Sequence, residues 1–248
     1  MDKISIDRYI SGAESLCREE RQFALYLNNI LLGIKAGKIT GNDRETILTA
    51  CGLDGAEIDD MFYEAAFMRD LFNNDKIQFN VRLLDYICSR KFKGVPDVET
   101  SRLEKMQEAV RNFHLGAEKG QEKLNEYPAV QFVTRVMMNA KPDIAVIYHK
   151  GTATKKYLLF IECKYLSKED TYKYGITQTA VQNWIAEFLC EQVFNDVFLE
   201  KVGSAVKLVR FISPLNKKME GLEGEGNITI KDLTELHGKI FSPCPIRR

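Results

Sequence analysis

The sequence predicts an α/β protein, in which a mixed central β-sheet is flanked by helices and follows an N-terminal helical region. Apolar residues recur at helical spacing through most of the first ninety residues. The second half instead contains runs of β-branched and aromatic residues of strand length. Gly94 and Pro96 mark the clearest boundary between the helical pattern and the strand-like pattern. We therefore expect a helical region over residues 1–95, for recognition, dimerisation or capping, and a sheet-based core over residues 96–248.

The helices of the first region follow from their apolar stripes and their end signals. Phe23, Leu27 and Ile34 share one face of the first helix. Asp59 and Asp60 suit the N-terminal dipole of the second. A polar helix rich in Glu and Lys follows this boundary and ends before a proline. The segments expected to be helical are 18–37, 55–72, 81–92 and 102–125.

Strands are expected where apolar β-forming residues cluster, over 129–138, 144–150, 155–166 and 205–213. Lys150-Gly151-Thr152 predicts a hairpin turn between the second and the third of these strands. A helix is expected over 177–200, and a short strand that leads into a helix is expected over 227–240. The order strand–strand–strand–helix–strand favours a mixed sheet with helices packed on it.

Composition narrows the class of protein. Lys+Arg and Asp+Glu both number 35, which argues against a uniformly basic nucleic-acid coat protein and against an acidic disordered tail. The zero net charge hides an asymmetry, because residues 1–100 hold 13 basic and 17 acidic residues and residues 101–248 hold 22 and 18. No signal peptide or long apolar run is visible, and the six cysteines are scattered. We expect a soluble, cytoplasmic protein without a membrane partner.

One cluster of charged residues stands apart, because each of its members adjoins a predicted strand. Asp143, after Pro142, opens the run DIAVIY, and Glu162-Cys163-Lys164 follows the run LLFI. Side chains alternate between the two faces of a strand, so Glu162 and Lys164 point to one side while Cys163 points to the core. Buried charges are costly without partners, which predicts that these side chains meet other charges.

A hairpin between the two strands would bring Asp143 close to Glu162, with two carboxylates within reach of one cation. Mg²⁺ takes oxygen ligands of this kind, together with waters and a carbonyl such as that of Cys163. Lys164 would lie beside the ion, where its ammonium orients water and offsets phosphate charge. The expected chemistry is metal-assisted phosphodiester hydrolysis with Mg²⁺ or Mn²⁺.

Pro142-Asp143 and Glu162-Cys163-Lys164 resemble the signature of the PD-(D/E)xK nuclease superfamily, over roughly residues 130–211. The triplet is the only acid-x-Lys sequence in the chain. The resemblance implies a restriction-endonuclease-like core and Mg²⁺-dependent endonuclease cleavage of DNA, in restriction, phage defence or repair. It also implies that Asp143 and Glu162 are metal ligands and that Lys164 is the catalytic lysine. Such enzymes often work as dimers, which makes a homodimer a candidate assembly.

Accessory residues follow from the same resemblance. Related nucleases often place a glutamine on the helix after the lysine, for which Gln178 and Gln182 are both candidates. An acid from another helix often joins the site, and Glu20 lies on the apolar stripe of the first helix. An interhelical ion pair or a solvated first turn of the helix is the preferred explanation for such an acid. The helix-borne acids left open are Glu20, Glu64, Glu118 and Glu122.

Lysines and tyrosines interleave between residues 141 and 174, a pattern that suits phosphate contacts and base stacking. Lys168, Lys173 and Tyr174 follow the motif strand and are the candidates for gripping a nucleic-acid backbone. Two other classes of protein remain open. The chain could be a catalytically silent nucleic-acid-binding protein of the same fold, or a helical interaction protein whose strand charges are structural.

Overall fold

The computed structural model describes residues 20–64, 66–90, 92, 102–114, 126–137, 140–165, 171–172, 175–194, 199–213 and 226–241. The chain forms two compact units, each assembled from separate segments. Unit 1 comprises residues 1–63, 143–168 and 198–248, and unit 2 comprises residues 64–142 and 169–197. This division interleaves the chain, whereas the sequence led us to expect two consecutive regions that meet at residue 95.

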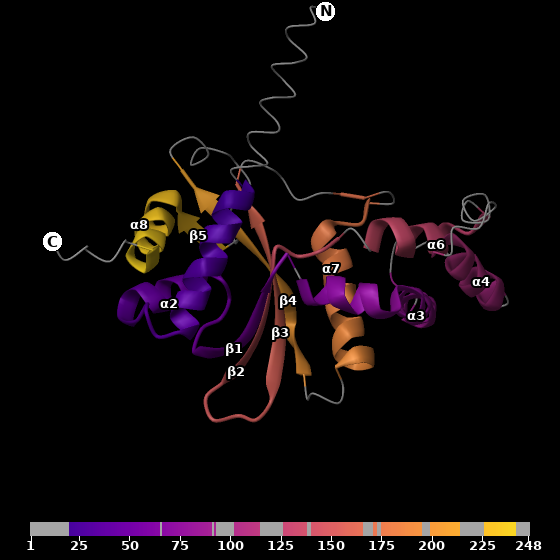
Figure 1. Ribbon diagram of the computed structural model, residues 1–248, viewed down its shortest axis with the longest axis horizontal. Coiled ribbons are helices and arrows are strands. Elements are labelled where there is room, and N and C mark those ends of the chain that lie inside the picture. Colours follow the sequence, from indigo (N-terminus) through magenta and orange to yellow (C-terminus); the bar gives the residue numbers. More distant parts are fainter. Residues whose placement is uncertain are drawn as a thin grey trace, which may run out of the picture. The chain divides into compact units, whose positions relative to one another are not determined.

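A five-stranded mixed sheet organises unit 1 and makes the protein α/β (Figure 1). The strands are β1 (Ala56–Tyr63), β2 (Ile144–Lys150), β3 (Lys156–Lys164), β4 (Leu199–Ile212) and β5 (Gly226–Thr229). They lie side by side in chain order; β1, β2 and β3 are antiparallel, whereas β4 runs parallel to β3 and β5 runs parallel to β4. Gly151, with a φ of 61°, turns β2 into β3, as the sequence predicted.

One face of this sheet carries the hydrophobic core of unit 1. Helix 20–35, helix α2 (Gly41–Ala50) and helix α8 (Ile230–Phe241) contribute to it. Leu27, Leu48 and Leu233 from these helices pack with Ile161 and Phe211 of the sheet, and all five are fully buried. The apolar stripe predicted for the first helix is therefore confirmed, whereas α2 was not predicted.

The named elements of unit 2 are helices and π-helical turns. It contains α3 (Ala66–Arg90), α4 (Leu103–His114), α6 (Pro128–Gln131), the π-helical turn η2 (Phe132–Val136), α7 (Gln178–Phe188) and the π-helical turn η5 (Leu189–Val193). Phe188 of α7 makes edge contacts with Phe79 and Tyr86 of α3, at centroid distances of 5.2 and 5.5 Å. These aromatic contacts join two helices that are distant in sequence.

Two predicted elements were wrong. Residues 55–63 are not helical, because they form the edge strand β1 and pair with β2. Residues 129–136 are not a strand but helical turns, because their buried positions Val130, Val133 and Thr134 fall at helical spacing. The predicted strands 144–150, 155–166 and 205–213 are confirmed as parts of β2, β3 and β4.

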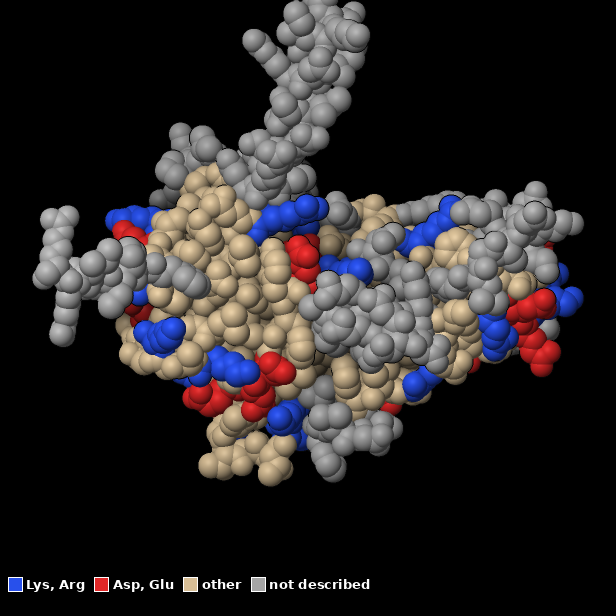
Figure 2. Space-filling model, in the orientation of Figure 1, with Lys and Arg blue, Asp and Glu red and all other residues tan. Residues whose placement is uncertain are grey.

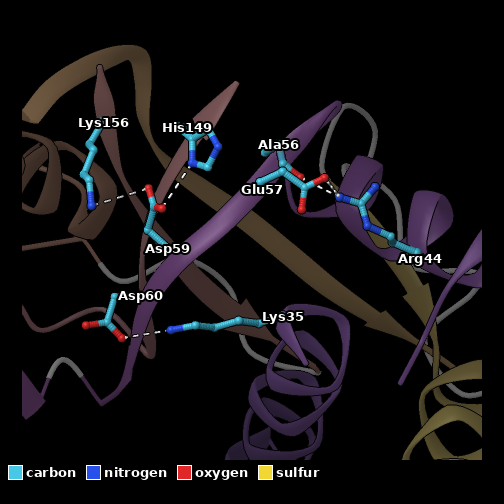
Figure 3. A network of polar contacts seen from close by, with 8 residues as sticks. All are labelled: Lys35, Arg44, Ala56, Glu57, Asp59, Asp60, His149 and Lys156. Carbon is cyan, nitrogen blue, oxygen red and sulfur yellow. Dashed lines mark hydrogen bonds and ion pairs between the residues drawn. The ribbon is translucent and has the colours of Figure 1, made fainter. Parts of the chain in front are cut away.

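Polar contacts hold the edge strand β1 in place (Figure 3). Its register shifts by one residue between Ile58 and Asp60, so Asp59 sits at a bulge. Figure 3 shows the Asp59 carboxylate between His149 and Lys156, with a 3.1 Å contact from Oδ1 to His149 Nδ1 and 3.9 Å from Oδ2 to Lys156 Nζ. A bulge and charged side chains keep an exposed edge from pairing with other strands.

Among the helices that the structure describes, none has the length and the apolar character needed to cross a membrane.

Gly226 opens β5 against the end of α2 and tolerates no side chain. A Cβ built there would lie 1.8 Å from the carbonyl oxygen of Ala50, a backbone atom that cannot turn away. We expect Gly226→Ala to lower the free energy of unfolding by about 2–3 kcal/mol, at the upper end of overpacking effects. Chemical unfolding of the two proteins, followed by circular dichroism, measures this loss.

Gly33→Ala is the matched control. The three atoms nearest to a Cβ at Gly33 would all belong to side chains, with Cδ1 and Cγ1 of Ile240 at 2.8 and 3.3 Å and Cδ1 of Ile39 at 3.4 Å. The better helix propensity of alanine offsets these contacts, so the free energy of unfolding should change by less than about 1 kcal/mol. Equal losses in the two variants would contradict the packing described at β5.

Candidate active site

Strands β2 and β3 bring the two halves of the sequence motif together. The antiparallel register pairs Ile144 with Ile161, and one further step places Asp143 opposite Glu162. The Asp143 carboxylate binds to the backbone at this end of the strand pair. Its Oδ2 accepts a 2.7 Å hydrogen bond from the backbone N–H of Cys163. The hairpin pairing and the proximity predicted from the sequence are both present.

The alternation predicted along β3 is also confirmed. Cys163 is fully buried in the hydrophobic core of unit 1, on the same face as Ile161. Glu162 and Lys164 point to the opposite face and are only 4% and 5% exposed. The ammonium of Lys164 lies 2.9 Å from Oε1 of Glu162, so the two form a buried ion pair. Each charge of this pair lowers the cost of burying the other.

The electrostatics of the cluster reflect an excess of carboxylates. Burial and, after it, the charge of Glu162 raise the pKa of Asp143 from 3.8 to about 7, against the opposing effects of the Cys163 N–H and Lys164. Burial by itself would lower the pKa of Lys164. Its ion pair and hydrogen bond with Glu162, helped by two further carboxylates, leave that pKa raised instead. Lys164 is therefore protonated at neutral pH.

Glu20 joins this cluster from the first helix, 145 residues away along the chain. Its Oε2 accepts a 2.8 Å hydrogen bond from the backbone N–H of Tyr165, directly after β3. Its negative charge also raises the pKa of both Asp143 and Lys164. The acid on the apolar stripe of the helix thus lies close to the motif. Tyr165 anchors this junction further, because its ring packs edge-on against Phe23 at 5.2 Å.

The donor chemistry of the cluster fits a hard divalent ion. Within the described residues, no three His, Cys, Asp or Glu side chains stand close enough to form a ready-made metal cage. Mg²⁺ does not require such a cage, since it usually binds through one or two carboxylates and keeps several waters. Asp143 and Glu162 provide two carboxylates, and the raised pKa of Asp143 marks a buried negative excess that a cation would relieve.

The structure describes three of the remaining predicted site residues, Gln178, Gln182 and Glu64. Gln178 and Gln182 are buried on α7 in unit 2, where Gln182 Nε2 donates a 3.3 Å hydrogen bond to the carbonyl of Lys141. Glu64 follows β1 as an exposed residue with a φ of 49°, and is not on a helix. The predicted residues outside the described part of the chain are Lys168, Lys173, Tyr174, Glu118 and Glu122.

Arg210 is a buried charge that sequence reasoning missed. It lies in β4, pairs with Lys164 of β3 in parallel register and is only 3% exposed. The run Val209-Arg210-Phe211 contained the signal, because a charge between two apolar strand residues faces away from the core.

The surface charge of one face of the protein is mixed in sign. Figure 2 shows that Lys and Arg side chains are interspersed with Asp and Glu over the described part of the face in view. An interspersed pattern gives no broad field of one sign to steer a polyanion.

No known family of proteins, no curated protein and no solved structure matches this chain.

Proposed function

We propose that this protein is a divalent-metal-dependent nuclease that hydrolyses DNA phosphodiester bonds. The main support for the proposal is that Asp143, Glu162 and Lys164 lie close together at one end of the β2–β3 pair. Glu20 lies beside them. Two carboxylates and a protonated lysine, held on neighbouring strands, are a set of groups suited to hydrolysis of a phosphodiester.

Each residue has a distinct task in this proposal. Asp143, Glu162 and the backbone carbonyl of Cys163 would hold Mg²⁺ or Mn²⁺. Such an ion supplies Lewis-acid polarisation of the phosphate and lowers the pKa of water. Lys164, protonated at neutral pH, acts as a cation and hydrogen-bond donor that orients the attacking water and balances phosphate charge. Its raised pKa argues against a role as general base.

The strand arrangement also supports the proposal. The resemblance to PD-(D/E)xK nucleases implies a mixed sheet with the motif on adjacent strands, and the sheet of unit 1 is mixed. We therefore propose a restriction-endonuclease-like core, and a role in restriction or phage defence. Glu162 and Lys164 are almost fully buried, so the proposal requires that a phosphate gains access to them.

Cleavage assays test the function directly. Purified protein is incubated with plasmid, linear duplexes of varied sequence, single-stranded DNA and RNA, with Mg²⁺, Mn²⁺ or EDTA. We expect DNA cleavage that needs the metal and that falls about 10²–10³-fold in Lys164→Met. Lys156→Met is the matched control, because Lys156 lies on the same strand and the same face, at the other end of β3.

The outcomes separate the candidate functions. Cleavage that is equal in Lys164→Met and Lys156→Met would remove Lys164 from the chemistry. Binding of DNA without any turnover in either metal would favour a catalytically silent binding protein. Absence of both binding and cleavage across all substrates would leave the strand charges as a structural cluster.

A further inference from the structure

Arg210 occupies the position next to Lys164 on the neighbouring strand. The parallel register of β3 and β4 runs without a shift from Phe160 opposite Val206 to Lys164 opposite Arg210. Val209 and Phe211, on either side of Arg210, belong to the hydrophobic core of unit 1. Alternation along β4 therefore directs Arg210 to the other face of the sheet, which is also the face of Lys164 and its partner.

Arg210 keeps its positive charge in a buried position. A guanidinium stays charged at any pH that a protein tolerates, so it cannot relieve burial by losing its proton. Arg210 nevertheless lies only 3% exposed, in the strand between β3 and β5. Adjacent strands are about 4.8 Å apart, which sets the bases of two cationic side chains, Lys164 and Arg210, side by side. Like charges in that arrangement repel, unless anions share them.

The charge balance of the cluster would accommodate an anion of the substrate once a divalent metal ion is bound. Electrostatic interactions link three carboxylates, Glu20, Asp143 and Glu162, with one described cation, Lys164. Arg210, which pairs with Lys164 in strand register, adds a second cation on the same face. A divalent cation bound by the carboxylates would reverse the net charge from minus one to plus one. A phosphodiester carries one negative charge, so it restores neutrality. Without Arg210, the metal-loaded cluster would already be neutral and the phosphate would remain uncompensated.

We propose that Arg210 binds the phosphate at the cleavage site, beside Lys164. This inference rests on the proposed nuclease function and adds a substrate-contacting residue to it. The guanidinium has five N–H donors in a planar fork, so it can hold a protein acceptor and still present two donors to phosphate oxygens. Lys164 offers a point charge to the same phosphate, whereas Arg210 fixes its orientation through paired hydrogen bonds.

The salt dependence of DNA binding tests this contact separately from catalysis. A labelled 30-base-pair duplex is titrated in Ca²⁺ at several salt concentrations, and cleavage is measured in parallel with Mg²⁺. Loss of one phosphate contact lowers the slope of log K against log salt by about 0.9. We expect this loss in Arg210→Gln, with a fall in kcat/KM of about 100-fold. Both quantities should stay at the wild-type level in the control Lys207→Gln.

Lys207 is the matched control because it lies on the same strand, three residues earlier, and on the opposite face. Its side chain lies close to Gly52 and Gly226, on the face of the sheet opposite to that of Lys164. An unchanged slope and rate in Arg210→Gln would overturn the role of Arg210 while the nuclease function stands. A wild-type protein that neither binds nor cleaves DNA would overturn both proposals.

Arg210→Lys keeps the experiment decisive if Arg210→Gln does not fold. Lysine preserves the charge but loses the paired hydrogen bonds. We expect the salt slope to stay at its wild-type value while kcat/KM falls about 10-fold. Wild-type kcat/KM in Arg210→Lys, together with an unchanged slope, would show that the fork geometry is not used and would overturn the proposed contact.

Discussion

Replacing Asp143 by asparagine is expected to abolish metal-dependent cleavage and, at the same time, to stabilise the metal-free protein. The carboxyl is buried beside Glu162 and its pKa is raised to about 7, so holding it ionised costs free energy. Asparagine keeps an oxygen that can accept the 2.7 Å hydrogen bond from the Cys163 N–H. At pH 8 we expect the free energy of unfolding to rise by about 2–4 kcal/mol.

The dependence on pH has a defined sign. Asp143 has a higher pKa in the folded protein than its ordinary value of 3.8, so the folded state binds the extra proton between pH 4 and pH 7. The contribution of this group to stability is fully present below about pH 4 and is lost as the pH rises through 7. Thermal unfolding in EDTA should therefore give similar midpoints for wild type and Asp143→Asn near pH 4. The midpoint of the variant should be higher at pH 8.

Divalent metal should act against the difference in unfolding midpoint between wild type and Asp143→Asn at pH 8. An ion bound by Asp143 stabilises the folded wild-type protein in proportion to its occupancy, so Mg²⁺ or Mn²⁺ should raise the wild-type midpoint at pH 8. The variant should show little shift. Asp60→Asn is the control, because Asp60 is more than half exposed and its ion pair with Lys35, at 3.4 Å, is weak. A stability loss in Asp143→Asn, without a loss of cleavage, would identify Asp143 as part of a structural pair.

The motif residues were predictable because their geometry is local. Alternation along β3 separates Glu162 and Lys164 from Cys163, and a short hairpin fixes the register that brings in Asp143. Neither step requires knowledge of distant parts of the chain. Glu20 could be recognised only as an acid on an apolar stripe, because its hydrogen bond to Tyr165 depends on how the first helix packs on the sheet.

The errors have equally specific causes. In β1, the bulge at Asp59 inserts one residue into the alternation, so Ile58, Met61 and Phe62 fall at the spacing of a helix face. In residues 129–136, β-branched composition favoured a strand, yet the buried side chains follow helical spacing. Arg210 escaped notice because its importance comes from pairing β4 with β3, a contact between strands separated by α7 in the chain. The local run Val209-Arg210-Phe211 indicates only that Arg210 faces away from the core, and not that it lies beside Lys164.

Replacing Lys164 by methionine should remove activity and have the opposite effect on stability from Asp143→Asn. The Lys164 ammonium lies 2.9 Å from Glu162 Oε1, and both side chains are almost fully buried. Removal of one partner leaves a buried carboxylate without its cation, which destabilises proteins by about 3–5 kcal/mol. Chemical unfolding of metal-free protein at pH 8 measures the loss, and Lys156→Met, which breaks only a 3.9 Å half-exposed pair with Asp59, should lose less than about 1 kcal/mol.

The double variant Glu162→Gln with Lys164→Met decides whether the pair is kept for stability or for chemistry. With both charges gone, the buried position no longer holds an uncompensated ion, so most of the stability lost in Lys164→Met should return. Cleavage should remain absent, because the double variant lacks both a metal carboxylate and the lysine. Recovery of stability without recovery of activity would mean that the buried charges are maintained for catalysis. A purely structural pair would not need charges that lower the free energy of unfolding when one of them is removed. A double variant as unstable as Lys164→Met would instead place the role of the two side chains in packing.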